Sequence, residues 1–205
     1  MQCTSPSCDQ NATFHPTWIE GRRCVKEEHL CENHARPTLV SYSMEPRKPS
    51  GTPRTLDGAT EFDLELLVMT DQPRKDHDNQ LVWLCEVGGS RRIPIMIGRF
   101  ETAALVNSIK REASSRPQTH DAIVNTFQAL GCEMEYLLVH KLENHTYFGD
   151  LHIRQQDRLA TVDVRPSDGL VLAVLLDRPI FFANEVVEKS LSPPTVDTIV
   201  LTRTT

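Results

Sequence analysis

The sequence lacks the features that mark membrane-spanning, secreted and nucleic-acid-coating proteins. No apolar run among its 205 residues approaches the roughly 20 residues that span a bilayer. The first residues are not a basic start followed by an apolar core, so we predict a cytoplasmic protein without a secretory signal or a membrane partner. The formal net charge is −6, so any contact with nucleic acid needs a local basic groove or a metal ion.

The sequence also lacks the motifs of several common enzyme classes. It contains no G-x-x-x-x-G-K-S/T, G-x-G-x-x-G, G-x-S-x-G or H-E-x-x-H pattern. Hydrolysis of nucleoside triphosphates, dinucleotide redox chemistry and ordinary serine hydrolysis are therefore not indicated. Hydrophobic residues make up 39% and charged residues 24%, which is typical of a soluble globular domain, and the length leaves room for a small appendage.

Four of the six cysteines lie in the first 31 residues and indicate a metal site. Cys3 and Cys8 form a C-x4-C pair, and His34 follows Cys31 at a C-x-x-H spacing, as at structural zinc sites. The segment between the two pairs predicts a short hairpin that turns at Gly21. A segment this short buries too little apolar surface to fold alone, so we predict that Cys3, Cys8, Cys31 and His34 hold a structural zinc ion.

Other zinc ligands remain open within this segment. Cys24 is left over in the hairpin, and with His15 and His29 it is a candidate substitute; the alternative to a zinc module is a disordered tail with reactive thiols. The pattern at residues 12–15 and 28–35 resembles the N-terminal zinc module of bacterial protein-arginine kinase activator proteins, whose ligand pairs look like C-x-x-C. Here the first pair is wider and the last ligand is His. The resemblance implies zinc binding.

Prolines interspersed with Ser, Thr, Lys and Arg dominate residues 37–58. Neither a helical nor a strand period is apparent there, so we predict a semi-extended, mobile linker. The linker would separate a zinc-binding module at residues 1–36 from a main domain at 59–191. A Pro-rich tail at 192–205 would follow and end in an edge strand at 198–201.

Periodicity and turn signals predict an α+β main domain of antiparallel strands with three to four helices. The predicted strands are 61–70, 81–87, 92–97, 133–141, 146–154, 158–164 and 178–182. The predicted helices are 100–112, 120–130, 170–176 and 185–190.

The stretch at residues 163–169 gathers polar groups at a strand-to-helix turn. Asp163 and Arg165 should point to the same side of the strand, because side chains alternate along it. Pro166 suits the first helical turn, and Ser167 and Asp168 offer oxygens to the free amides there. A well-capped helix beside a surface ion pair is the simpler interpretation of this turn seen alone.

The stretch at residues 116–121 marks a second helix start. Thr119 is predicted as the N-cap and Asp121 as a first-turn acid, which places His120 in the first turn. A lone His there is more often a surface or capping residue than a catalyst. Glu101 falls in the first turn of the preceding helix.

Together these turns carry groups that suit phosphodiester chemistry. Carboxylates can hold Mg²⁺ or Mn²⁺, and a held cation could activate water. A histidine could move a proton and arginines could brace a phosphate. If two helix starts converge, they would form one anion pocket whose acids either bind a cation or are each paired with an arginine. The acids concerned are Glu101, Asp121, Asp163 and Asp168; the other groups are His120, Arg116 and Arg165.

Read together, residues 93–101, 116–121, 162–168 and 179–186 resemble the bifunctional nuclease (DUF151) family. The resemblance covers about 64–189. It departs from the family pattern at Gly169, where alanine is usual, and at Arg99, in a turn usually free of that charge.

The resemblance implies DNase and RNase activity and an intertwined α+β fold that self-associates, hence a homo-oligomer. On the matching motif positions we assign catalytic roles to His120, Asp121, Asp163, Asp168 and Glu101. Substrate-binding roles go to Arg116, Arg165, Ser167 and Thr119.

Two functions from different classes follow. The first is a nuclease that hydrolyses phosphodiester bonds of DNA or RNA with the help of Mg²⁺ or Mn²⁺, which the family resemblance favours. The second is a non-enzymatic oligomeric regulator or adaptor that docks a protein partner through its zinc module. The acidic net charge and the kinase-activator-like module favour the second.

Overall fold

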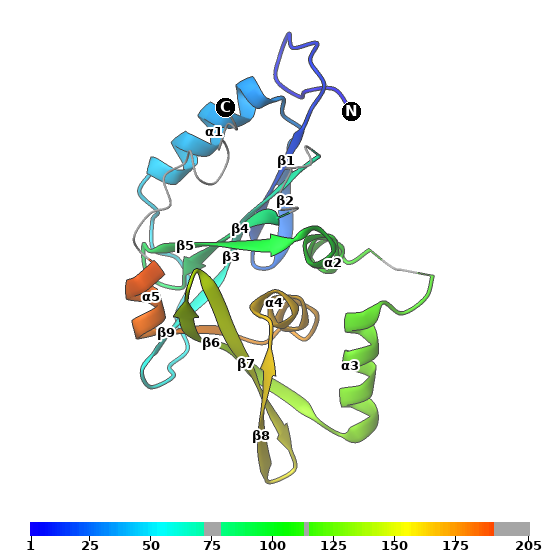
Figure 1. The fold of residues 1–205 in the computed structure, drawn as a ribbon, viewed down its shortest axis with the longest axis vertical. Coiled ribbons are helices and arrows are strands. Elements are labelled where there is room, and N and C mark those ends of the chain that lie inside the picture. The colour runs from blue at the N-terminus through cyan, green and yellow to red at the C-terminus, as the bar shows by residue number, and fades with distance from the viewer. Residues whose placement is uncertain (72–78, 113–114, 191–205) are drawn as a thin grey trace.

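The computed structural model describes residues 1–71, 79–112 and 115–190 (Figure 1). In chain order the elements are β1 (Phe14–Glu20), β2 (Arg23–Glu27), α1 (Glu32–Met44), β3 (Ala59–Thr70), β4 (Asn79–Glu86), β5 (Arg92–Gly98), α2 (Arg99–Lys110), α3 (Thr119–Leu130), β6 (Glu133–Glu143), β7 (Thr146–Gln155), β8 (Arg158–Val164), α4 (Pro166–Leu175), β9 (Ile180–Ala183) and α5 (Asn184–Ser190). The predicted α+β class with mainly antiparallel strands is confirmed. None of the helices in these ranges is both long enough and apolar enough to cross a membrane.

The nine strands of the described residues form one sheet. Its main path runs β2-β1-β3-β9-β6-β7-β8, and β4 pairs with both β3 and β5. The predicted hairpin β4–β5 and the meander β6–β7–β8 are antiparallel, as expected, whereas β9 pairs with β6 in parallel. The sheet has two halves, β1 to β5 and β6 to β9. Strand β3 links them, because it pairs with β1 and β4 and, near its start, with β9.

Helices α2 and α4 pack side by side between the two halves of the sheet, and α3 lies beside α4 (Figure 1). The core between these helices and the sheet contains fully buried Phe62, Leu105, Leu170 and Phe182. Burying each such side chain stabilises the fold by about 1.5–3 kcal/mol. Helices α2, α3 and α4 therefore start from fixed positions, and the candidate site is built at those starts.

The N-terminal hairpin is confirmed and joins the main sheet. Strands β1 and β2 are antiparallel and turn at Gly21, whose φ of +53° is a conformation that glycine adopts without strain. Strand β1 also pairs with β3, from Phe14 opposite Thr70 to Trp18 opposite Leu66. The hairpin is therefore an outer part of the same sheet.

The predicted linker is wrong at its start, because residues 37–44 belong to helix α1. This helix buries Ala35 and Leu39 against the apolar face of β1 and β3. Pro37 lies inside the helix. Tertiary burial thus maintains a helix in a stretch whose proline content and weak periodicity predicted none.

The rest of the predicted linker has no regular structure, but it is held against the sheet. The Arg47 guanidinium donates hydrogen bonds to Glu65 Oε1 at 3.2 Å, to the Glu86 carbonyl at 2.8 Å and to the Gly89 carbonyl at 2.6 Å. Burial opposes the charge on Glu65, but hydrogen bonds from Arg92 and Tyr42 outweigh burial and lower the pKa of Glu65. The prediction of a mobile linker does not fit this anchored path.

Of two helix starts in the main domain, one differs from its prediction and one agrees with it. Helix α3 is capped by Gln118, not Thr119, and the Asp121 carboxylate accepts a hydrogen bond from the Gln118 amide at 2.9 Å. Helix α4 begins at Pro166, as the strand-to-helix turn predicted, and its first turn precedes the apolar run at Leu170. Proline has a φ preset for the first helical position. The edge strand predicted at 198–201 lies outside the described residues.

Candidate functional site

The first turns of α2, α3 and α4 meet in one chain of charged contacts. His120 Nε2 lies 3.1 Å from Asp168 Oδ1, and Arg165 Nε donates to Asp168 Oδ2 at 2.8 Å. The other side of the Arg165 guanidinium contacts Glu101 Oε1 at 2.8 Å. The structure thus brings together four of the predicted site residues, one or two from each helix start.

Local sequence explains why these side chains converge. Arg165 is the N-cap of α4, and Asp168 lies one turn further on, so both flank the same turn. Gly98 caps α2, and a Cβ at that position would clash with the folded-back carboxylate of Glu101. Because α2 packs on α4, the carboxylates of Glu101 and Asp168 approach the same guanidinium.

The contacts give the cluster a defined electrostatic character. Hydrogen bonding and attraction from Asp168, followed by attraction from Glu101, raise the pKa of Arg165. The side chains of His120 and Asp168 are only 12% and 20% exposed, whereas Arg165 is 68% exposed. The His120–Asp168 pair is therefore partly shielded from water, and Arg165 covers it from the solvent side.

Other predicted site residues lie apart from this cluster. Asp163 is exposed on β8 and faces Asp150 of β7 in the strand register. Asp121 caps α3, and Ser167 is buried in the first turn of α4. Arg116 and Thr119 are exposed. Within the described ranges, no hydrogen bond or ion pair links these two residues to the cluster.

The acids of the main domain do not assemble into a cation site. Among the described residues, the four N-terminal Cys and His ligands are the only group of three or more candidate ligands with atoms close enough to share a metal. Asp168 and Glu101 are both paired with Arg165. Of the two arrangements predicted for these acids, the geometry shows pairing with arginine, not a preassembled site for Mg²⁺ or Mn²⁺.

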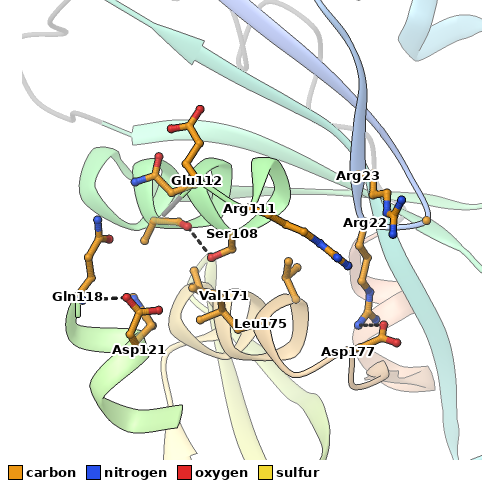
Figure 2. Close-up of a pocket in the computed structure, with 15 residues that line it drawn as sticks. Arg22, Arg23, Ser108, Arg111, Glu112, Gln118, Asp121, Val171, Leu175 and Asp177 are labelled. Atoms are coloured by element: carbon orange, nitrogen blue, oxygen red, sulfur yellow. Dashed lines mark hydrogen bonds and ion pairs between the residues drawn. The ribbon is translucent and has the colours of Figure 1, made fainter. Parts of the chain in front are cut away.

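A cleft of about 610 Å³ opens beside this cluster. His120 and Asp121 of α3 line one wall, and Arg111 ends α2 above it (Figure 2). Val171 and Leu175 of α4 form an apolar floor. The opposite wall is the turn of the N-terminal hairpin, with Gly21, Arg22 and Arg23. The motif histidine thus lines a cleft whose rim carries both arginines and acids.

Three arginines that line the cleft were not among the predicted site residues: Arg22, Arg23 and Arg111. An Arg-Arg pair after a turn glycine is a signal that could have been noticed. Nothing in the sequence, however, indicates that this turn lies next to α4, because the contact joins segments about 150 residues apart.

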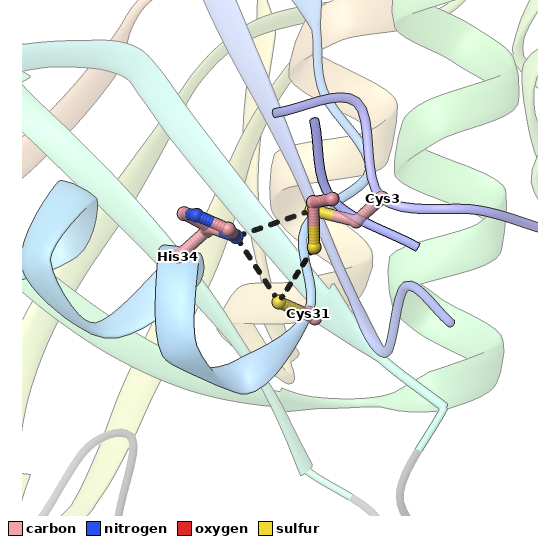
Figure 3. A group of neighbouring side chains, drawn as sticks. Cys3, Cys31 and His34 are labelled. Atoms are coloured by element: carbon pink, nitrogen blue, oxygen red, sulfur yellow. Dashed lines mark hydrogen bonds between the residues drawn. The ribbon is translucent and has the colours of Figure 1, made fainter. Parts of the chain in front are cut away.

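Four of the N-terminal Cys and His residues lie in one group (Figure 3). Ligand atoms of Cys3, Cys8, Cys31 and His34 are all within 4.8 Å of one another. Cys8 Sγ and Cys31 Sγ are 3.8 Å apart. Two sulfurs at the Zn–S distance in a tetrahedral site are separated by about 3.8 Å, so the spacing suits a metal ion.

The remaining candidate ligands lie outside this group. His15 Nδ1 is 2.8 Å from His29 Nδ1, and His15 Nε2 is 2.9 Å from Asp71 Oδ2, so these residues form a hydrogen-bonded chain of their own.

Burial raises the pKa of the Cys3 thiol, but hydrogen bonds, led by the Cys31 backbone, outweigh it and lower the pKa to about 6. A thiolate is the metal-binding form of cysteine.

Comparison with known proteins assigns the main domain to a family. Residues 82–194 match the Bifunctional nuclease domain. The chain belongs to the bifunctional nuclease domain family. The matched region contains the whole cluster of Glu101, His120, Arg165 and Asp168. It excludes the hairpin β1–β2, helix α1 and the Cys and His group.

Two relatives from strains of Mycobacterium tuberculosis are similar to this chain: the uncharacterized proteins Rv1829 and MT1877. Each is 30% identical over 123 residues, which is 60% of this chain and 71% of the relative. Their names state no activity, so the evidence on function comes from the site and the family domain.

Proposed function

We propose that this protein is a nuclease that hydrolyses phosphodiester bonds of DNA or RNA in the cleft beside His120. The observation that carries the proposal is the 3.1 Å contact between Asp168 Oδ1 and Nε2 of His120, the residue that lines the cleft. A carboxylate-oriented histidine is an arrangement suited to general acid–base catalysis. Membership of the bifunctional nuclease domain family supports the same chemistry.

We assign the members of the cluster roles that fit their contacts. An ionised Asp168 only accepts hydrogen bonds, so His120 Nε2 carries the proton and Nδ1 is the nitrogen that can take a proton from an attacking hydroxyl or water. Arg165, held between Glu101 and Asp168, positions the carboxylate and offers its exposed guanidinium edge to a phosphate. Use of Mg²⁺ or Mn²⁺ would require Asp168 or Glu101 to exchange Arg165 for the cation.

We propose in addition that the Cys3, Cys8, Cys31 and His34 group binds zinc in a structural role. A set of three sulfurs and one ring nitrogen, without a carboxylate, is typical of structural zinc sites. Such an ion would tie the N-terminus and the start of α1 to each other beside the hairpin.

A regulator without enzymatic activity is the second candidate function. The specific observation in its favour is that Glu101 and Asp168 are both neutralised by Arg165, an arrangement that also serves stability alone. In that case the zinc module would dock a protein partner.

One experiment separates the two functions. Metal-stripped protein is incubated with single-stranded and double-stranded DNA and RNA, and Mg²⁺ or Mn²⁺ is then added. Cleavage that appears with protein and is lost in His120→Asn supports the nuclease. Intact substrates under every condition, with folded protein, would leave the regulator as the function.

A further inference from the structure

The turn of the N-terminal hairpin forms one wall of the cleft, although it lies outside the family domain. Gly21, Arg22 and Arg23 line the side opposite His120. A wall contributed by an added segment gives this chain a cleft that residues 82–194 cannot form alone. The hairpin therefore has a position suited to contact with whatever binds there.

The turn is fixed firmly to the main domain. Arg22 donates from Nε to Asp63 Oδ1 at 3.0 Å and from Nη1 to the Ala173 carbonyl at 2.9 Å. Its side chain is 12% exposed, and Asp177 Oδ1 lies 3.4 Å from Nη1. Further along β2, Lys110 at the end of α2 contacts Glu27 at 2.9 Å. Arg22 thus anchors the turn, and its charge is already compensated.

Two other arginines of the cleft have no ion-pair partner among the described residues. Arg23 and Arg111 are exposed, and neither forms an ion pair within the described part of the chain. Figure 2 shows the Arg111 side chain extending from the end of α2 toward the hairpin turn. Of the acids that line the cleft, Asp121 accepts the cap hydrogen bond of α3, Asp177 pairs with Arg22, and Glu112 is exposed. Arg23 and Arg111 are therefore the two cleft guanidiniums that are free to pair with the oxygens of a ligand.

We propose that Arg23 and Arg111 bind a backbone phosphate of a single-stranded nucleic acid, next to the phosphodiester that reaches His120. Guanidiniums suit phosphate recognition, and the apolar floor of Val171 and Leu175 suits a sugar or base. A cleft of about 610 Å³ has the size of a pocket for a small molecule, so it accommodates a few nucleotides of one strand and not a duplex. This inference rests on the proposed nuclease function and names its substrate class.

The test measures binding separately from cleavage. A short, fluorescein-labelled, single-stranded DNA with phosphorothioate linkages is titrated with the full-length protein, and anisotropy gives Kd at several salt concentrations. Arg23→Gln and Arg111→Gln should each weaken binding about tenfold, the loss expected for a contact between charged groups. Each should also lower the slope of log Kd against log salt by about 0.7, because one phosphate contact is lost.

Controls distinguish a lost contact from a lost fold or a general charge effect. Arg158→Gln makes the same charge change at the exposed start of β8, away from the cleft, and should leave both Kd and slope unchanged. Arg23→Lys and Arg111→Lys keep the charge and should keep the salt slope. A double-stranded competitor of equal sequence should displace the probe poorly.

The outcomes separate this inference from the proposed function. If Arg23→Gln and Arg111→Gln bind like wild type while wild type cleaves DNA or RNA, the phosphate site is wrong and the nuclease stands. If both variants lose affinity and slope while no substrate is cleaved, the phosphate site stands and the nuclease is wrong. Equal affinity for duplex and single strand would overturn the assigned substrate class.

Discussion

Asp168 is the residue that joins the candidate site, since its two carboxylate oxygens contact His120 and Arg165 separately. Asp168→Asn removes the charge from both contacts, and we expect a loss of about 1–3 kcal/mol in the free energy of unfolding. For a chain of this length that loss corresponds to a fall of very roughly 2–12 °C in Tm. Thermal unfolding of the purified variant measures it.

Asp163→Asn is the matched control, because Asp163 is exposed on β8 and outside the cluster. We expect its Tm to equal that of wild type. If instead Asp163→Asn abolished cleavage while Asp168→Asn had no effect on either property, the assignment of Asp168 as the centre of the site would be wrong.

Gly169 stands where the resemblance leads us to expect alanine, and its surroundings in α4 explain the glycine. A Cβ at this position would lie 2.5 Å from Cδ1 of buried Leu137 on β6. Gly169→Ala should therefore lower stability by about 1–3 kcal/mol through overpacking, although alanine is the better helix former. Urea unfolding of Gly169→Ala, Leu137→Val and the double variant checks the cause. A double variant whose loss equals the sum of the single losses would exclude the clash.

At the residue scale, the sequence identifies part of the site. His120, Asp168, Arg165 and Glu101 could be predicted because capping and turn residues place them at helix starts. Asp163 and Arg116 carry the same motif signal but lie outside the cluster. The motif predicts where these residues lie along the chain. It does not predict which side chains share a partner, because that depends on how α2 and α4 pack.

The N-terminal hairpin and α1 depend on each other at the scale of elements. Cys3 and Cys8 precede the hairpin, whereas Cys31 and His34 begin α1, so a bound ion would connect the two. We expect near-stoichiometric zinc in wild type and its loss in Cys31→Ser, together with faster proteolysis of α1. Elemental analysis and limited proteolysis measure these effects.

Cys24→Ser provides the control for this prediction, because Cys24 lies in the same hairpin but outside the ligand group. It should retain zinc and the wild-type digestion pattern. Loss of zinc in Cys24→Ser with retention in Cys31→Ser would show that the ligand set is different.

Elements of the main domain were predictable because each carries its own period and turn signals. Helix α1 was not, because the proline-rich composition masks a helix whose stability comes from burial of Ala35 and Leu39. The pairing of β1 with β3 was not predictable either. These strands are separated by about forty residues of chain, and only tertiary packing selects their register.

At the scale of the whole molecule, β8 is the terminal strand of the sheet within the described residues, and it exposes two apolar side chains. Leu159 is 65% exposed and Val162 45% exposed. Uncovered edges of this kind favour association between chains, so we expect at least a dimer in solution. Light scattering at micromolar concentration should give that mass for wild type and a monomer for a variant that combines Leu159→Glu and Val162→Glu.

Thr161→Glu lies on the same strand between these residues and is also exposed, so it serves as the charge control. It should remain associated. A monomeric wild type would contradict the predicted homo-oligomer.

The cleavage rate of His120→Asn decides whether the protein is a nuclease of the proposed kind, since His120 is the one residue of the cluster with a proposed role in proton transfer. His145→Asn is the matched control, because His145 is exposed in the turn between β6 and β7, and its φ of +61° is one that asparagine tolerates. Both variants are compared with wild type on a labelled single-stranded substrate at equal folded concentration. We predict that His120→Asn loses about 100-fold or more in rate and that His145→Asn does not change. Equal cleavage rates for the two variants would show that His120 does not transfer the proton.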